Sequence, residues 1–384
     1  MNLFDDEEDG AVEEGFLLAE DLPAAGLLSP KDSDFCLGFD KEEQEFLKLF
    51  NSGKMPHALI FAGAEGIGKF TYAYRVARFL LSQEVHDPNQ DALFGEPEPM
   101  EAANLSVGND HPTFRRIAAG GHADFLLIER KYDEGSDRYK DSVEVSEVRR
   151  VAPFLRKTAA EGGWRVVIVN DADTMNRNAQ NAILKILEEP PANTLLILVA
   201  HRPGALIPTI RSRARVMNFS PLGADDFSTL IGKQGHVLSN QELQALYTLS
   251  EASVGRALDL LDNGGLDMMG KVIAVFQDYP EWKWSQIHVV AEDLGRSSSG
   301  RNFSMFKNVM QWIAAQLVKS KARAVHLPDG PLSGMPVFQT MLASSSLERL
   351  IEICDTLQGH FALVQNGNLE KRQAVLRAFS IFAA

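Results

Sequence analysis

The alternation of apolar and polar positions is most informative between Trp164 and Arg215. An unbroken apolar run at 166–169 is followed by the polar corner 170–173, a helical pattern from Asn178 to Glu189, and a second apolar run at 195–199. Unbroken apolar strands of this kind are typical of a parallel sheet whose two faces are both covered by helices. The polar corner should therefore lie at the carboxyl end of a strand, where open α/β sheets bind their ligands.

A second such unit lies earlier in the chain. The apolar run 58–61 predicts a strand, and the helix expected after it extends to about Leu81. Between them lies a glycine-rich turn with the pattern G-x-x-x-x-G-K, which predicts a phosphate-binding loop because glycines let backbone N–H groups converge on phosphate and the lysine reaches the outer phosphates. Its candidate binding residues are Gly63, Gly66, Gly68 and Lys69.

Two positions that should hold Mg²⁺ carry other side chains. Phe70 stands where a P-loop ATPase has Ser or Thr, and Asn170 stands where an acidic residue should follow the second strand. Asp171 falls where a water-orienting glutamate would be. We therefore expect no ATP hydrolysis by this chain alone, and a glycine-rich turn that binds no nucleotide remains an alternative.

The strand pattern ends near Pro221, and apolar residues then recur at helical spacing. The predicted fold class is thus α/β plus all-α. Four regions are expected: an acidic, disordered tail at 1–38, an α/β P-loop domain at 39–220, a small helical domain at 221–265, and a larger helical domain at 266–384.

Composition narrows the function classes. The net charge of -14 argues against a broad basic surface that grips nucleic acid alone. Cys36 and Cys354 are far apart, which supports neither a disulfide framework nor a zinc site. The chain has no run of about 18 apolar residues and no secretory or transit signal at its start, so we expect a cytoplasmic protein.

These motifs together resemble the AAA+ modules of bacterial clamp loaders, from about Phe39 to the C-terminus. The resemblance rests on the P-loop after a strand, the polar corner, Leu187-Glu188-Glu189-Pro190-Pro191, and the later Arg211-Ser212-Arg213. It implies an AAA+ α/β module, a helical lid and a helical collar that mediates oligomerisation. The loss of both metal-binding positions makes the chain resemble an ATPase-inactive member of the family more than the ATP-hydrolysing gamma/tau subunits.

The resemblance also assigns roles to single residues. Arg213 matches the family's trans arginine finger, which reaches the nucleotide of a neighbouring subunit; an internal salt bridge is the alternative. His201 falls at the sensor-1 position and Arg256 at the sensor-2 position. Family members often bind zinc through four cysteines after the first helix, and this chain has none there, so no zinc is expected.

The implied function is that of a rigid clamp-loader subunit without independent catalysis. It would join delta and gamma/tau subunits in a hetero-pentamer that opens the β sliding clamp and places it on primer–template DNA for the DNA polymerase III holoenzyme. No cofactor is required, passive binding of ATP or ADP stays open, and no membrane is involved. The alternatives are an active gamma/tau-like ATPase, which would need Phe70 and Asn170 to be tolerated, and a small-molecule P-loop kinase.

Overall fold

A computed structural model describes residues 29–83, 101–133, 138–161, 163–296, 301–327, 330–367 and 370–383. In these ranges, five strands form a parallel sheet in the order β2-β5-β6-β1-β7. The strands are β1 (Ala58–Ala62), β2 (Phe125–Ile128), β5 (Arg165–Val169), β6 (Thr194–Ala200) and β7 (Arg215–Asn218). The three central strands β1, β5 and β6 are buried along their whole length, as their unbroken apolar sequences predict.

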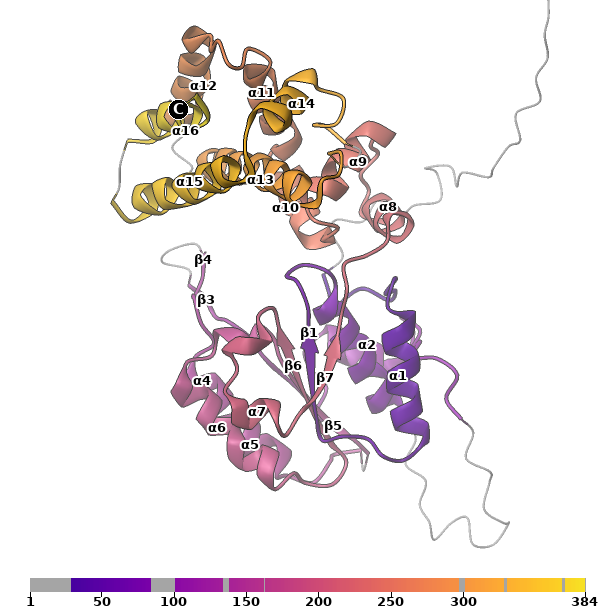
Figure 1. Cartoon of the computed structure of the whole chain (residues 1–384). Helices are drawn as coiled ribbons and strands as arrows, with labels where there is room; N and C mark the ends of the chain where they lie inside the picture. Colours follow the sequence, from indigo (N-terminus) through magenta and orange to yellow (C-terminus); the bar gives the residue numbers. More distant parts are fainter. Residues whose placement is uncertain are drawn as a thin grey trace, which may run out of the picture.

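Helices cover both faces of the sheet (Figure 1). One face packs against α1 (Asp40–Asn51) and α2 (Lys69–Ser82), and α3 (Pro112–Ala118) packs beside α2. The other face packs against a layer formed by α4 (Val145–Val148), α5 (Val151–Leu155), α6 (Arg177–Glu188) and α7 (Pro208–Arg211). Two short 3-10 turns, η3 (Ala172–Thr174) and η4 (Pro203–Ala205), lie next to each other beyond the ends of β5 and β6.

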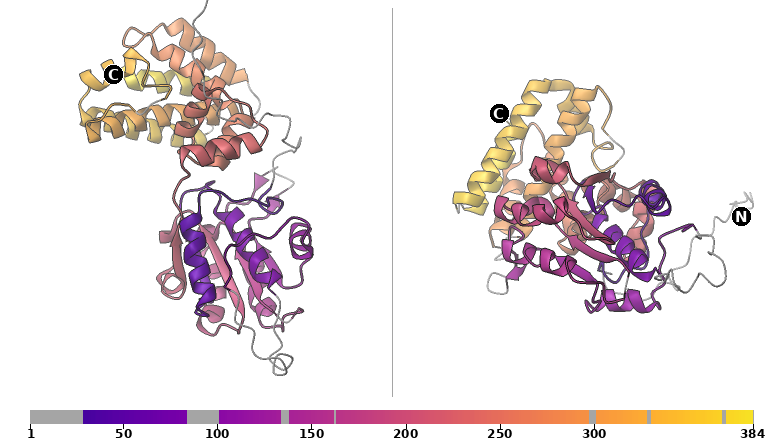
Figure 2. Two further views of the ribbon diagram at one scale, coloured as in Figure 1. Left: turned by 90° about the vertical axis from the view of Figure 1, so that its right-hand side faces the viewer. Right: turned by 90° about the horizontal axis from the view of Figure 1, so that it is seen from below.

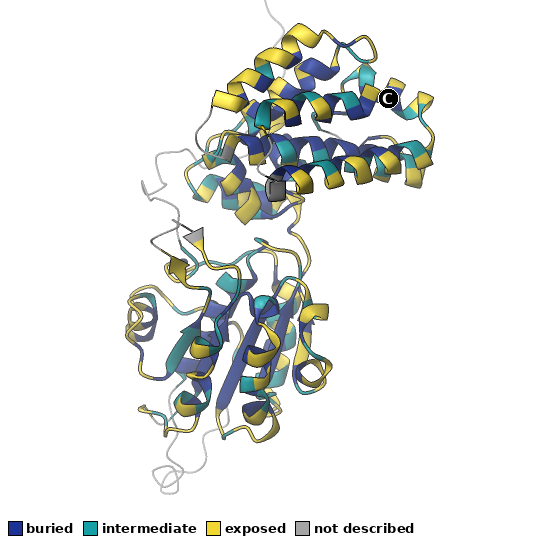
Figure 3. Ribbon diagram, turned by 90° about the vertical axis from the view of Figure 1, so that its left-hand side faces the viewer, coloured by how far each residue is buried: buried dark blue, intermediate teal, exposed yellow. Residues whose placement is uncertain are grey.

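The rest of the chain is helical and lies beyond the carboxyl ends of the strands (Figures 1 and 2). The helices are α8 (Ala224–Lys233), α9 (Asn240–Leu249), α10 (Val254–Asp262), α11 (Gly265–Phe276), α12 (Trp284–Arg296), α13 (Arg301–Arg323), α14 (Pro336–Ser344), α15 (Leu347–Gly367) and α16 (Lys371–Ala383). Each helix turns its buried residues inward and its exposed ones outward (Figure 3). The predicted fold class, α/β plus all-α, is confirmed, while the domain boundaries at 220 and 265 stay predictions.

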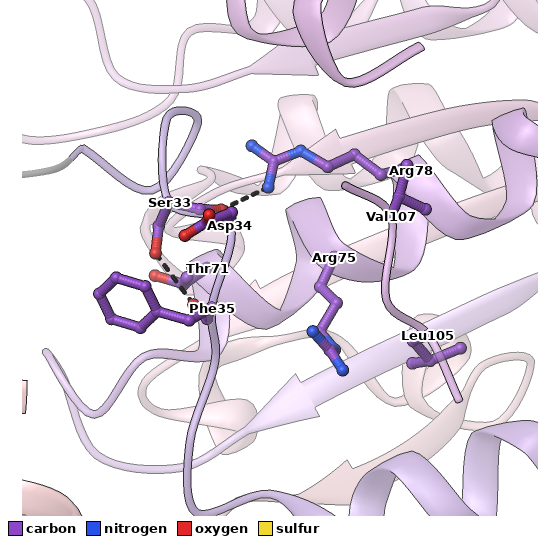
Figure 4. A pocket seen from close by; sticks show the side chains of 8 residues that line it. All are labelled: Ser33, Asp34, Phe35, Thr71, Arg75, Arg78, Leu105 and Val107. Carbon is purple, nitrogen blue, oxygen red and sulfur yellow. Dashed lines mark hydrogen bonds between the residues drawn. The ribbon is translucent and has the colours of Figure 1, made fainter. Parts of the chain in front are cut away.

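The predicted disordered tail is too long at its C-terminal end. Residues 29–38 pack against α2, where the Arg78 guanidinium donates hydrogen bonds to the carbonyl oxygens of Lys31 and Ser33. Figure 4 shows Arg78 reaching Ser33. The ring of Phe39 packs edge-on against Tyr72 of α2, and Cys36 packs against the same apolar core. The acidic composition of the N-terminal region gave no sign of this contact. Residues 1–28 and 84–100 lie outside the described residues.

Three short strands were not predicted. The edge strand β7 pairs with β1, but only two of its four residues are apolar and only Met217 is buried, so it lacks the unbroken apolar run of a buried strand. A small antiparallel hairpin of β3 (Tyr132–Asp133) and β4 (Arg138–Tyr139) interrupts the charged segment after β2. No helix in the described ranges has both the length and the apolar character needed to cross a membrane.

Candidate functional site

A cavity of about 410 Å³ opens at the carboxyl edge of the sheet. The P-loop, the corner after β5, the end of β6 and the start of α10 all contribute to its walls. The segment 30–39 and the lid residues Leu222, Leu230 and Leu258 add apolar surface. Predicted site residues Gly66, Gly68, Lys69, Asp171 and His201 line this cavity together.

The P-loop turn depends on its glycines. Gly66 (φ +73°) and Gly68 (φ +101°) adopt left-handed backbone conformations that favour glycine. Gly63 is needed for a different reason: a Cβ atom there would lie 2.4 Å from the Phe219 carbonyl oxygen, which follows β7. The glycine spacing read from the sequence thus reflects both turn geometry and a close approach between chain segments.

Lys69 is the first residue of α2 and is only 2% exposed. Its Nζ donates to the carbonyl oxygen of Gly63 at 2.9 Å and to that of Ala64, and lies 3.0 Å from Nδ1 of His201. An ammonium group has three donors and no acceptor, so all three are used within the chain. Burial lowers the pKa of Lys69 to about 8, although the carboxylates of Asp173, Glu65 and Asp171 oppose the shift.

His201 continues this network on its other side. Because Lys69 can only donate, Nδ1 of His201 must accept, and its Nε2–H then donates to Oδ1 of Asp171 at 2.8 Å. Oδ2 of Asp171 accepts from Nε of Arg130 at 2.6 Å. Burial alone raises the pKa of Asp171, but the hydrogen bonds from His201 and Arg130 outweigh burial and hold this pKa below its usual value. The network couples the P-loop lysine to three side chains from β2, β5 and β6.

The side chains around the P-loop do not fit Mg²⁺. Phe70 lines the cavity and packs its ring against Tyr74 at 5.0 Å, so a hydrocarbon stands where a hydroxyl ligand is needed. Asn170 offers a neutral amide, and Asp171 is already bound on both oxygens. Across the described residues, no group of three or more His, Cys, Asp or Glu side chains could hold a metal ion.

The start of α10 closes directly onto the P-loop. Ser253 Oγ donates to the Glu65 carbonyl oxygen at 2.8 Å, and the Gly255 backbone N–H donates to that of Gly66 at 2.8 Å. A Cβ atom on Gly255 would lie 2.9 Å from Gly66 Cα, so the two backbones touch. The predicted sensor-2 residue Arg256 is not among the residues that line the cavity; its guanidinium pairs with Glu251 at 3.0 Å instead.

Arg213 lies at the opposite edge of the sheet from the cavity. It immediately precedes β7, whose first residue Arg215 pairs with Leu59 near the start of the parallel strand β1. Its Nη2 lies 3.0 Å from Oε1 of Glu188, and its Nη1 donates to the Thr209 carbonyl oxygen at 3.1 Å. The side chain remains 36% exposed. Arg213 therefore cannot reach its own cavity without large rearrangement of the sheet.

Sequence reasoning missed three functional candidates. Arg130 directly follows β2 at the same edge as the polar corner, and that position was the available signal. Asp173 accepts hydrogen bonds from the backbone N–H groups of His201 and Arg202, which fixes the end of β6. Glu188 entered the sequence analysis only as part of the motif Leu187 to Pro191. No neighbouring residue in the sequence indicated its ion pair with Arg213.

Comparison with known proteins finds similarity to subunits of DNA polymerase III. Residues 40–223 match the family model described as DNA polymerase III, delta subunit. DNA polymerase III subunit delta' of Pseudomonas aeruginosa is 36% identical over 157 residues, and that of Escherichia coli is 30% identical over 217 residues. Over this region the chain is similar to the delta-prime subunits of DNA polymerase III.

The matches to the delta-prime family are partial. They cover 41% of this chain and 41% of the Pseudomonas protein, and 56% of this chain and 58% of the Escherichia protein. The chain thus spans about half the length of these curated relatives. The solved structure of a DNA polymerase III gamma subunit-related protein from Thermotoga maritima covers 88% of this chain and 98% of its own, with 16% identity and a TM-score of 0.40.

Proposed function

We propose that this chain is the delta-prime subunit of a DNA polymerase III clamp loader, that it does not hydrolyse ATP itself, and that it supplies Arg213 to the ATP site of a neighbouring subunit. The observation that carries the proposal is the position of Arg213 at the edge of the sheet opposite the chain's own cavity. An arginine there can act on phosphate only across an interface. A planar, permanently charged guanidinium is well suited to stabilise charge on a transferring phosphoryl group.

The residues around the cavity support the part of the proposal that the chain does not hydrolyse ATP itself. Lys69 has all three donors on internal partners, and both positions expected to hold Mg²⁺ carry unsuitable side chains. A triphosphate would have to displace His201 and the Gly63 and Ala64 carbonyl oxygens from Lys69. The hydrogen bonds between α10 and the P-loop would also hold the lid in one position, as expected of a rigid subunit.

The proposed partners follow from the similarity to delta-prime subunits. They are delta and gamma/tau subunits in a hetero-pentamer, with the β sliding clamp and primer–template DNA bound by the whole complex. The chain's net charge of -14 favours DNA contact shared with partners over binding by this chain alone. Its contribution to DNA synthesis would be indirect, through placement of the clamp.

One observation favours a second candidate, an active gamma/tau-like ATPase. The cavity has a volume of about 410 Å³, and the P-loop lysine Lys69 lines it. This volume is within the range of small-ligand sites. Passive binding of ATP or ADP would use the same space. Mg²⁺-dependent turnover by the isolated chain would distinguish the active ATPase from passive binding.

The test is ATP hydrolysis by a reconstituted loader that contains either the native chain or Arg213→Ala. We expect turnover at the receiving site to fall by about 10³- to 10⁵-fold, which is the usual contribution of an arginine finger. The total rate of ATP hydrolysis by the loader should fall by the fraction that the receiving site contributes. The chain alone should show no Mg²⁺-dependent hydrolysis.

Arg211→Ala is the matched control, because Arg211 is exposed and its guanidinium has no ion-pair partner within the described part of the chain. It should leave turnover unchanged. Light scattering must show that every variant assembles. Unchanged turnover in a correctly assembled Arg213→Ala loader, or hydrolysis by the chain alone, would overturn the proposal.

A further inference from the structure

Glu188 occupies an unfavourable position for a carboxylate. It is the last residue of α6, where the partial negative charge of the helix end repels an anion. Local helix stability therefore gives no reason for a glutamate here. Its partner is the Arg213 guanidinium, whose Nη2 lies 3.0 Å from Oε1 of Glu188.

Arg213 is held by an ion pair and a hydrogen bond from two different elements. Glu188 at the end of α6 binds Nη2, while the Thr209 carbonyl oxygen in α7 accepts from Nη1 at 3.1 Å. The backbone beneath is also fixed, because the N–H groups of Arg213 and Ala214 both donate to the carbonyl oxygen of the fully buried Ile210 at 3.1 Å. The ion pair with Glu188 and the hydrogen bond to Thr209 restrict the orientation of this planar group, and further N–H donors remain for a ligand.

We infer that Glu188 is a positioning residue for Arg213 and holds the guanidinium in the orientation that a neighbour's phosphate meets. The inference rests on the proposed function of Arg213. An exposed arginine side chain samples many rotamers, and fixing it before the partner arrives removes the entropy cost of ordering it at the transition state. The pair is exposed on both sides, at 36% for Arg213 and 51% for Glu188, so a neighbouring subunit can approach it.

The experiment measures kcat and KM for ATP in the reconstituted loader with Glu188→Ala, Glu188→Gln and the control Glu189→Ala. Glu189 is the adjacent glutamate, also exposed, and its carboxylate has no ion pair with any described residue. We expect Glu188→Ala to lower kcat at the receiving site about 3- to 30-fold with KM at that site unchanged, because a disordered finger weakens transition-state stabilisation and leaves ground-state binding intact. Glu188→Gln keeps an acceptor oxygen in place and should recover part of the loss.

A double variant separates this inference from the proposed function. If Glu188 acts through Arg213, adding Glu188→Ala to Arg213→Ala should cause no further loss. If Arg213→Ala lowers turnover while Glu188→Ala behaves like Glu189→Ala, the positioning role is wrong and the proposed function survives. A rise in kcat for Glu188→Ala would also overturn the inference, since it would mean that Glu188 restrains the finger. No effect of Arg213→Ala itself would instead contradict the proposed function.

Discussion

Lys69 and Arg213 are both cations on long side chains that phosphate chemistry can use, yet the fold surrounds them differently. Lys69 lies at the carboxyl edge of the sheet and is 2% exposed. Its ammonium group donates hydrogen bonds to Gly63, Ala64 and His201. Arg213 lies near the amino ends of the strands, is 36% exposed, and forms a partly exposed ion pair with Glu188. The difference follows from solvent: a buried ammonium must find internal partners, whereas an exposed guanidinium can keep donors for a partner molecule.

The two regions also differ in how firmly they are built. The cavity region is fixed by backbone contacts, including Gly63 against Phe219 and Gly66 against Gly255. The Arg213 side chain is held by one ion pair and one hydrogen bond at the surface. Substitutions in the cavity region should therefore affect stability strongly, and substitutions at the arginine edge should affect mainly the function of an assembly.

The largest expected effect on stability tests the backbone contact at the P-loop. Gly63→Ala would place a Cβ atom 2.4 Å from the Phe219 carbonyl oxygen, and backbone cannot move aside as a side chain can. We expect the free energy of unfolding to fall by about 2 to 4 kcal/mol, measured by urea denaturation. Gly204→Ala is the control, because its Cβ would meet nothing within 4 Å. Equal stability of the two variants would show that the P-loop region is not rigid.

An intermediate effect tests the burial of Lys69. Its pKa is about 8 in the folded chain and about 10.4 in an unfolded one, so between these values the unfolded state binds more protons. The free energy of unfolding should therefore rise with pH in this window, by on the order of 1 to 3 kcal/mol relative to Lys69→Met. Urea denaturation of both proteins between pH 7.5 and 10.5 measures this difference. A difference that stays constant or falls with pH would contradict a buried, strained ammonium.

The smallest expected effect concerns Arg213. Because its ion pair with Glu188 is exposed on both sides, Arg213→Ala should change the free energy of unfolding by less than about 1 kcal/mol. The same urea titration at neutral pH measures it. A loss as large as that of Gly63→Ala would mean that Arg213 is a structural residue, and the contrast with the cavity region would disappear.

Much of the fold could be read from short-range patterns. The apolar runs at 58–61, 166–169 and 195–199 predicted β1, β5 and β6, since a strand buried on both faces needs apolar residues at every position. The glycine spacing before Lys69 located the P-loop because positive backbone φ angles favour glycine. The presence of Phe70 and Asn170 at the two expected metal positions could also be read from the sequence, because it depends on residue identity alone.

Only the tertiary structure decided which charged groups meet. Lys69 and His201 are 132 residues apart in sequence, and Arg130 reaches Asp171 from a different strand. Arg213 could have paired with any nearby carboxylate, and Arg256, expected at the cavity, pairs with Glu251 instead. Periodicity and turn chemistry act over a few residues, whereas the partner of a long charged side chain depends on how distant elements pack. The sequence by itself thus determined the three central strands, the glycine-rich loop and its missing metal ligands, and packing determined that one cation faces inward and the other outward.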